Sequence, residues 1–285
     1  MERIGVVGCG LMGSGIAEMV ARSGSQVTVI ERDAAALEAG QERIEKSLSR
    51  AVAAGKVPEE EEADLARANL IFTLDFSDLA HCQLVIEAVA EDEATKIEIF
   101  KKLNEVLLDP LAILATNTSS IPIIKLAMVT KRPEQVIGLH FFNPVPVLKL
   151  VELISSLLTS AETTQRARDF AMGPLKKRVI TSPDRAGFVV NALLIPYLLS
   201  AIRMLESGFA SAEDIDTGMV VGCAHPLGPL ALTDLIGLDT THAVADSLYA
   251  EFKEPHMAAP PLLSRMTQAG LLGRKTGQGF YSYKK

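Results

Sequence analysis

The sequence predicts an α/β protein in which a doubly wound sheet, with helices on both faces, is followed by an all-α C-terminal domain. Three observations predict this class. Short apolar runs alternate with helical patterns over residues 1–182, residues 183–285 carry almost only helical patterns, and a glycine-rich turn follows the first apolar run. The alternation of strands and helices also predicts a parallel sheet.

The glycine-rich turn joins a strand that starts at residue 3 to a helix, and it contains Gly8, Gly10 and Gly13. The first glycine permits the tight turn, the second lets backbone approach a pyrophosphate, and the third lets the helix pack close to the strand. The N–H groups at the helix N-terminus then face the phosphates. A second strand at 26–30 is closed by Glu31, where the acid that binds the ribose hydroxyls belongs. These features predict a Rossmann-type dinucleotide-binding domain.

The residues around Glu31 bear on the choice of cofactor. The Glu31 carboxylate repels a 2′-phosphate, which favours NAD over NADP. Arg32 stands beside it and can hold that phosphate, so NADP stays open. A chance glycine turn is the alternative interpretation, and the combination of strand, helix and acid disfavours it.

Composition limits the other classes of function. The 285 residues predict about two domains, and 48% hydrophobic with 22% charged residues is ordinary for a globular protein. A net charge of −7 without a basic cluster disfavours nucleic acid as a partner. Cys9, Cys82 and Cys223 are scattered, which indicates a reducing compartment, and we expect the cytoplasm. The first strand leaves no room for a signal peptide, and the apolar stretch 187–202 is too short to span a bilayer, so no membrane is expected.

The remaining elements follow in order. In the first domain we predict helices at 34–54, at the acidic run 59–62 and at 91–107, and strands at 70–73, 84–89, 111–115, 136–140 and 150–154. In the second domain we predict helices at 187–207, 211–222, 228–235 and 239–252. Ligands of such sheets bind at the carboxyl ends of the strands, and two closely packed domains leave a cleft.

His140 and Glu152 are the predicted catalytic pair. His140 ends an apolar strand, and Glu152 lies inside the apolar run 150–154, where an unpaired carboxylate is costly to bury. The carboxylate would orient the imidazole and stabilise its protonated form, which makes His140 a general base. A structural histidine with a surface glutamate is the alternative, and the strand-end position disfavours it. No metal site is predicted.

Four motifs together resemble the 3-hydroxyacyl-CoA dehydrogenase family. They are the glycine turn, Asn-Thr-Ser-Ser at 117–120, His-Phe-Phe-Asn-Pro at 140–144 and Lys-Thr-Gly-Gln-Gly-Phe-Tyr at 275–281. The resemblance covers essentially the whole chain, and the short-chain 3-hydroxybutyryl-CoA branch fits best.

The resemblance implies a substrate and a mechanism. The substrate is an L-3-hydroxyacyl thioester of coenzyme A, and His140 takes the hydroxyl proton as hydride leaves for the nicotinamide. Glu152 orients His140, Ser119 hydrogen-bonds the reacting oxygen, and Asn191 is contributed by the helical domain.

The resemblance also implies the binding residues. The predicted cofactor-binding residues are Gly8, Gly10, Leu11, Met12, Gly13, Glu31, Glu91, Lys96, Ser119, Asn143 and Lys275. Without the resemblance, Glu91 and Lys96 look like solvated charge on a surface helix. For the substrate, Ser47, Ser119 and Asn191 match family positions, whereas a family lysine falls on Ala54 and Lys56 is the nearby substitute. Ala192 also departs from the arginine of many relatives.

Two other functions stay open. One is a related dehydrogenase of a free hydroxy acid or sugar acid. The other is a crystallin-like nucleotide-binding protein without turnover, although such a protein has no need to keep both His140 and Glu152. The resemblance further implies a homodimer, and an apolar helical domain of this size is consistent with a covered surface.

Overall fold

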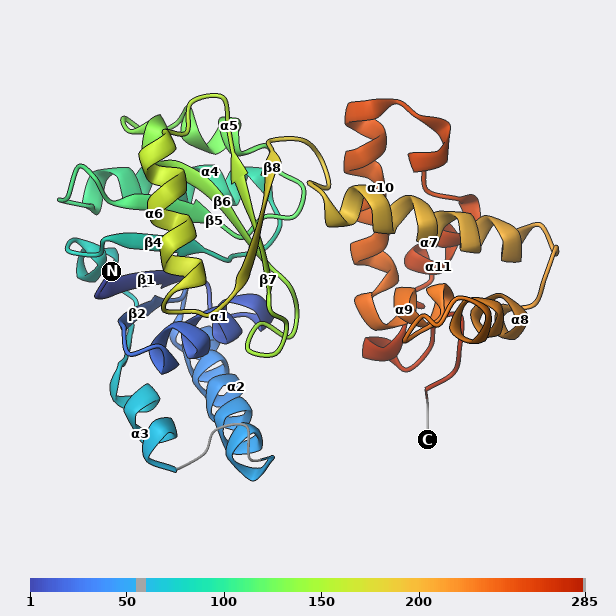
Figure 1. Cartoon of the computed structure of the whole chain (residues 1–285), viewed down its shortest axis with the longest axis horizontal. Helices are drawn as coiled ribbons and strands as arrows, with labels where there is room; N and C mark the ends of the chain where they lie inside the picture. Colours follow the sequence, from blue (N-terminus) through green and yellow to red (C-terminus); the bar gives the residue numbers. More distant parts are fainter. Residues whose placement is uncertain (55–59, 284–285) are drawn as a thin grey trace. The chain divides into compact units, whose positions relative to one another are not determined.

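The computed structural model describes residues 1–54 and 60–283, with the side chains of residues 60 and 61 excepted. It divides into two compact units, Met1–Asp184 and Arg185–Lys285 (Figure 1). The sequence places the domain boundary between residues 182 and 183. Each unit is described below by itself.

The first unit contains one eight-stranded sheet in the order β3-β2-β1-β4-β5-β6-β7-β8. The strands are β1 (Arg3–Val7), β2 (Gln26–Ile30), β3 (Leu70–Thr73), β4 (Leu84–Glu87), β5 (Ile113–Thr116), β6 (Val136–Phe141), β7 (Leu150–Ser155) and β8 (Arg178–Pro183). Strand order runs outward in both directions from β1 and β4, which makes this pair the switch point of the sheet. Ligands of doubly wound sheets bind at the carboxyl ends of strands at such a point.

The predicted parallel sheet is correct for β1 to β6 and wrong for the last two strands. β7 pairs with β6 antiparallel, and β8 pairs with β7 parallel, so both run against the other six. The physical reason is the connection between β6 and β7, which spans only residues 142–149. A chain can return antiparallel through a short connection, whereas a parallel return needs a crossover of about a dozen residues or more.

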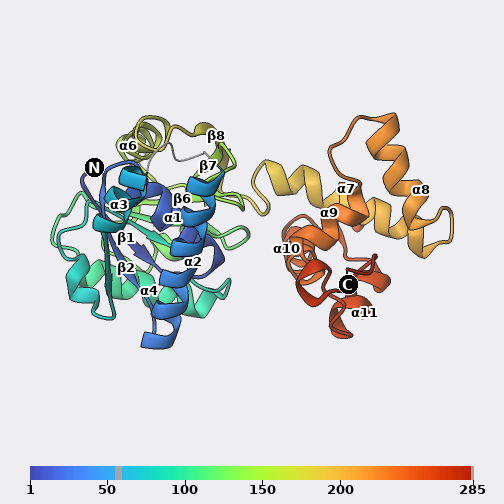
Figure 2. The ribbon, with the colours of Figure 1, turned by 90° about the horizontal axis from the view of Figure 1, so that it is seen from below.

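Helices cover both faces of the sheet (Figures 1 and 2). They are α1 (Leu11–Arg22), α2 (Ala34–Ala53), α3 (Glu60–Ala68), α4 (Glu93–Val106), α5 (Ile123–Ala127) and α6 (Ala161–Met172). Ile16 of α1, Ile44 of α2 and Phe170 of α6 share one core with the sheet. Side-chain caps fix where three of these helices start. Asp33 accepts a hydrogen bond from the Ala36 N–H at the start of α2. The Asp92 and Ser160 side chains each accept the corresponding bond from a backbone N–H in the first turn of α4 and of α6.

The second unit is all helical, as predicted. Its α-helices are α7 (Val190–Glu206), α8 (Ala212–Thr217), α9 (Pro229–Ile236), α10 (Leu238–Phe252) and α11 (Pro261–Gln268), and α8 continues into a π-helical turn at Gly218–Gly222. One face of α7 is buried in the core of this unit, through Ile195, Leu198 and Ile202. In the described residues, every helix is either too short or too polar to cross a membrane.

The helix predicted at 187–207 begins at Val190 in the structure, three residues after the predicted start. Gly187 and Phe188 have φ angles of +73° and +50°, which an α-helix does not contain, so the helix begins only at Val190. The stretch is also only partly buried, because Leu193 of α7 is 73% exposed.

Candidate active site

The glycine-rich turn between β1 and α1 has the geometry of a pyrophosphate site. Gly8 has a φ of +91°, and a Cβ at Gly13 would lie 1.8 Å from the carbonyl oxygen of Gly8, so both positions need glycine. A Cβ at Gly10 would meet nothing within 4 Å. Gly10 is also the N-cap of α1 and provides no side-chain cap, so it leaves the first N–H groups of the helix uncapped by its side chain. The turn therefore fits a dinucleotide.

Glu31 lies against this turn. One carboxylate oxygen accepts a hydrogen bond from the Cys9 N–H at 2.6 Å, and the other accepts from the Arg32 N–H at 3.0 Å. The Arg32 side chain is directed to Asp33, with 3.0 Å between Nε and Oδ2. A second cation is close, because Arg43 of α2 donates to the Cys9 carbonyl at 3.1 Å. Arg43 is not among the cofactor-binding residues predicted from the sequence.

The β6–β7 ladder brings His140 and Glu152 together. The register places them directly opposite each other in the antiparallel pair, so both side chains lie on the same face of the sheet. The His140 Nδ1 is 2.7 Å from the Glu152 Oε2. Glu152 is fully buried and His140 is nearly so. The contact expected from the sequence is present, and Phe142 places its ring centroid 4.7 Å from the imidazole.

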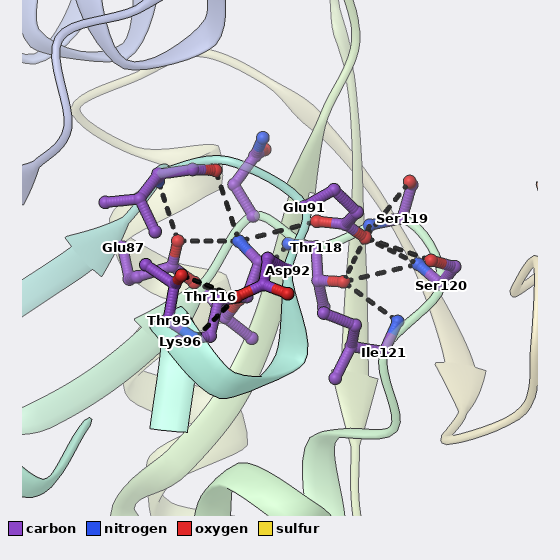
Figure 3. A network of polar contacts seen from close by, with 12 residues as sticks. Glu87, Glu91, Asp92, Thr95, Lys96, Thr116, Thr118, Ser119, Ser120 and Ile121 are labelled. Atoms are coloured by element: carbon purple, nitrogen blue, oxygen red, sulfur yellow. Dashed lines mark hydrogen bonds and ion pairs between the residues drawn. The ribbon is translucent and has the colours of Figure 1, made fainter. Parts of the chain in front are cut away.

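A buried ion-pair network lies at the carboxyl end of β4 (Figure 3). Glu87 ends this strand, and Lys96 reaches it from α4 with 2.6 Å between Nζ and Oε1. Glu87 also accepts from the Val89 N–H and from the Thr116 hydroxyl, each at 2.7 Å. Lys96 is 1% exposed and Glu87 is fully buried. The ammonium group therefore lies away from water.

Glu91 connects Lys96 to the loop after β5. Its Oε2 is 3.4 Å from Nζ, and its Oε1 accepts from the Thr118 hydroxyl at 2.5 Å and from the Ser119 N–H at 2.9 Å (Figure 3). Ser120 donates to the same oxygen through its N–H and its hydroxyl. Burial by itself raises the pKa of Glu91, but the Lys96 charge and these donors outweigh it and hold the pKa below its ordinary value. Glu91 is therefore an ionised anchor for the Ser119 loop.

Asn117 links this network to the His140 strand. Its N–H donates to the Glu87 carbonyl at 2.8 Å, and its Oδ1 accepts from the Phe141 N–H at 2.9 Å. Phe141 directly follows His140. The carboxyl ends of β4, β5 and β6 are thus held together by side chains, which places Ser119, Glu91 and His140 along one edge of the sheet.

The structure corrects one interpretation and adds residues that the sequence analysis missed. Lys96 is not solvated charge, because α4 packs its ammonium group against Glu87. Glu87, Thr116 and Thr118 were not identified as site residues. The signal for Glu87 was available, since it is a carboxylate inside the apolar run 84–89.

The other predicted residues are more dispersed. Asn143 is exposed on the segment 142–149, and Ser47 is half-buried on α2. Lys56 lies outside the described residues. Asn191 and Lys275 belong to the second unit. Asn191 is half-buried at the start of α7. The Lys275 Nζ lies 2.5 Å from Oδ1 and 2.6 Å from Oδ2 of Asp239, with which it forms an ion pair.

The doubly wound sheet, the glycine turn and the carboxylate after β2 define the class of dinucleotide-binding proteins. Comparison with known proteins identifies the family. Residues 3–185 match the model for the NAD-binding domain of 3-hydroxyacyl-CoA dehydrogenase, and residues 187–283 match the model for its C-terminal domain. The chain therefore belongs to the 3-hydroxyacyl-CoA dehydrogenase family.

Individual relatives agree along the whole chain. The chain is 59% identical to the 3-hydroxybutyryl-CoA dehydrogenase of Mycobacterium tuberculosis, over 99% of both proteins. The crystal structure of M. tuberculosis FadB2 superposes with a TM-score of 0.98 and 59% identity, covering 100% of this chain and 99% of that one. The (S)-3-hydroxybutyryl-CoA dehydrogenase PaaH1 of Ralstonia eutropha superposes with a TM-score of 0.94 and 43% identity, covering 100% of each.

Proposed function

We propose that this protein is an NAD-dependent dehydrogenase that interconverts L-3-hydroxyacyl-CoA, with 3-hydroxybutyryl-CoA as the preferred substrate, and 3-oxoacyl-CoA. The observation that carries the proposal is the His140–Glu152 pair at the carboxyl edge of the sheet, on the same edge as the glycine turn. The names of the relatives support the substrate class.

In this reaction His140 is the general base. Its Nδ1 faces the Glu152 carboxylate, so the proton on that nitrogen fixes the tautomer in which Nε2 accepts the proton of the substrate hydroxyl. Glu152 stabilises the imidazolium that results. The bound nicotinamide supplies the acceptor for the hydride that leaves the same substrate carbon. The Glu91 carboxylate holds Ser119 through its backbone N–H at 2.9 Å. The Ser119 hydroxyl gives up its long bond of 3.4 Å to Glu91 and donates to the reacting oxygen instead. In the reverse direction His140 returns the proton.

We propose NAD as the cofactor, because the Glu31 carboxylate lies beside the Cys9 N–H at the glycine turn, where it accepts the ribose hydroxyls and repels a 2′-phosphate. Arg32 is paired with Asp33, which weakens its ability to hold that phosphate. Gly8, Gly10, Leu11, Met12 and Gly13 hold the pyrophosphate, and Glu91, Lys96, Ser119, Asn143 and Lys275 complete the cofactor site.

The remaining predicted residues bind the substrate in this proposal. Ser47 and Lys56 bind the coenzyme A portion, and Asn191 contacts the substrate. The helical unit forms the interface of a homodimer. The free thiols of Cys9, Cys82 and Cys223 suit a reducing compartment, and we place the protein in the cytoplasm.

The test of the proposed function is oxidation of NADH or NADPH by acetoacetyl-CoA, followed by absorbance, with free acetoacetate as the comparison. We expect turnover with acetoacetyl-CoA and NADH, much less with NADPH, and almost none with the free acid. The His140→Ala variant is expected to lose turnover by about 10²–10⁴-fold and to keep its affinity for NADH. Turnover of the free acid at the rate of the thioester would favour the free-acid dehydrogenase, and folded protein that binds NADH without turnover would favour a nucleotide binder.

A further inference from the structure

We propose that the negative charge of Glu87 raises the affinity of the site for the oxidised cofactor relative to the reduced one. Glu87 acts as a member of a trio of charged side chains formed by Glu87, Lys96 and Glu91. The inference rests on the proposed function for the position of the nicotinamide. It extends that function, because it assigns Glu87 a role in the relative affinity for the two forms of the cofactor.

The topology places the nicotinamide end of the cofactor near this trio. Glu31 at the end of β2 marks the adenosine end, and the glycine turn after β1 marks the pyrophosphate. A dinucleotide that continues across the switch point passes over the carboxyl ends of β4 and β5. Glu87 ends β4, and His140, where hydride leaves the substrate, lies at the end of β6. The trio thus lies between the pyrophosphate site and the proposed base.

The trio carries a net charge of −1. Every partner of the Glu87 carboxylate is a donor: the Lys96 ammonium, the Val89 N–H and the Thr116 hydroxyl. Such bonds are those of an ionised carboxylate, which only accepts. Glu91 is held ionised by the same ammonium group and by the loop 118–120. Two carboxylates and one ammonium leave one negative charge in excess.

That excess charge acts on the difference in charge between the two cofactor forms. NAD⁺ and NADH carry the same phosphates, but the oxidised nicotinamide ring has a positive charge that the reduced ring lacks. Glu87 and Lys96 are almost completely shielded from water, so solvent screens their charges weakly. Removing one unit of charge that solvent screens this weakly is expected to change the relative affinity by roughly three- to tenfold.

The first test is the Glu87→Gln variant, which keeps the shape of the side chain and brings the trio to neutrality. Kd is measured for NADH by fluorescence titration and for NAD⁺ by competition. We expect the ratio of Kd for NAD⁺ to Kd for NADH to rise by roughly three- to tenfold. A purely structural role would change both constants by the same factor, and that result, or no change in either, would overturn the inference.

Two controls separate charge from geometry. Glu93→Gln removes the same charge from α4, but from an exposed pair with Lys125 at 2.8 Å, and it must leave the ratio unchanged. The double variant Glu87→Gln with Lys96→Met removes one negative and one positive charge, so the trio again carries −1 through Glu91. The ratio is expected to return to the wild-type value. A shift in the Glu93 control, or no return in the double variant, contradicts the charge argument.

A further variant decides the case if Glu87→Gln does not fold. The Glu91 side chain is 36% exposed, so Glu91→Gln neutralises the trio at its more accessible end, and the ratio must rise as for Glu87→Gln. An unchanged ratio overturns the inference. All these measurements use binary complexes without acyl-CoA. Wild-type protein that binds both cofactor forms but does not reduce acetoacetyl-CoA would therefore refute the proposed function and leave this test intact.

Discussion

At the residue scale, the Glu152 charge is separable from the shape of its side chain. Glutamine keeps the contact with the His140 Nδ1 but cannot stabilise the imidazolium as a carboxylate does. We expect Glu152→Gln to lower kcat by about 10²–10⁴-fold while Kd for NADH stays unchanged. Steady-state kinetics and fluorescence titration measure the two quantities. The control is Glu162→Gln, the same substitution at an exposed position of α6. Wild-type turnover in Glu152→Gln would remove the carboxylate from the mechanism.

Glu18 of α1 predicts a pH-dependent stability. It is 1% exposed, and its Oε2 has no hydrogen-bond partner in the described residues. Its Oε1 lies 3.4 Å from Nη1 of Arg22. Burial raises the pKa of Glu18 above its ordinary value of 4.5, although Ser47, Arg22 and Arg50 act in the opposite direction. Because the folded protein then binds this proton more tightly than the unfolded chain, stability falls as pH rises from about 4.5 through the raised pKa.

The Glu18→Gln variant tests the direction of this pH dependence of stability. Glutamine removes the charge whose burial is unfavourable, so we expect it to raise the free energy of unfolding at about pH 8 by about 1 kcal/mol. The gain should shrink as the pH falls to about 3.5, roughly one unit below the ordinary pKa, where Glu18 is protonated in both states. Thermal unfolding at both pH values measures the difference. A gain of equal size at the two values would show that ionisation of Glu18 is not its cause.

The same sequence signal explains one success and one failure in the candidate site. A carboxylate inside an apolar run, with a histidine across the turn, led to the His140–Glu152 contact. Glu87 shows the same signal, but its partner Lys96 lies on a polar helix start with Glu93 and Thr95. Only the packing of α4 onto the end of β4 buries that ammonium group, and helical periodicity does not show this packing.

At the element scale, Lys177 holds the segment 142–149, which joins β6 and β7, the strands that carry His140 and Glu152. Lys177, between α6 and β8, donates through Nζ to the carbonyls of Val145 at 2.6 Å and Leu148 at 2.5 Å. Burial lowers the pKa of Lys177. The segment also packs on the helix after the glycine turn, because a Cβ at Gly15 would lie 3.0 Å from the Val145 Cβ.

Lys177→Met should therefore loosen this segment. It leaves two carbonyls without their donor, and we expect the free energy of unfolding to fall by about 1–3 kcal/mol. Hydrogen exchange should accelerate in residues 142–149 more than in β1 or β4, and Kd for NADH should rise if Asn143 contacts the cofactor as proposed. The neighbouring exposed Lys176→Met is the matched control. Uniform acceleration of exchange across the sheet would point to general destabilisation instead.

The predictability of the elements follows how clearly the sequence marks them. The strands at 3–7, 26–30 and 70–73 were predicted closely, because short apolar runs stand between clear turn or helix signals. β8, α5, α6 and α11 were not predicted. β8 contains only two apolar residues, Val179 and Ile180, before it ends at Thr-Ser-Pro, and the sequence of α6 is mostly polar. The reversed direction of β7 depends on the length of a loop, which apolar patterns do not encode.

At the scale of the whole molecule, each unit has its own hydrophobic core. The first core joins the sheet to α1, α2 and α6, and the second gathers around α7. The change from alternating strands and helices to helices alone was visible in the sequence, since each pattern extends over many residues. The roles of the two units in binding cofactor and substrate depend on individual side chains, such as Lys275 and Asn191, and these remain proposals.

The exposed apolar surface of the second unit predicts the oligomeric state. The second unit exposes large apolar side chains, with Leu193 at 73%, Phe209 at 79% and Val221 at 79%. Exposed apolar surface on a small helical unit is the kind of surface that a symmetric partner covers. We expect a homodimer, so sedimentation equilibrium at micromolar concentration should give 2 × 30.6 kDa, or about 61 kDa. At least one of Leu193→Asp, Phe209→Asp and Val221→Asp should reduce the mass towards 30.6 kDa, while Leu157→Asp, at an exposed turn of the first unit, should leave the dimer intact. A wild-type mass of 30.6 kDa under these conditions would contradict the dimer.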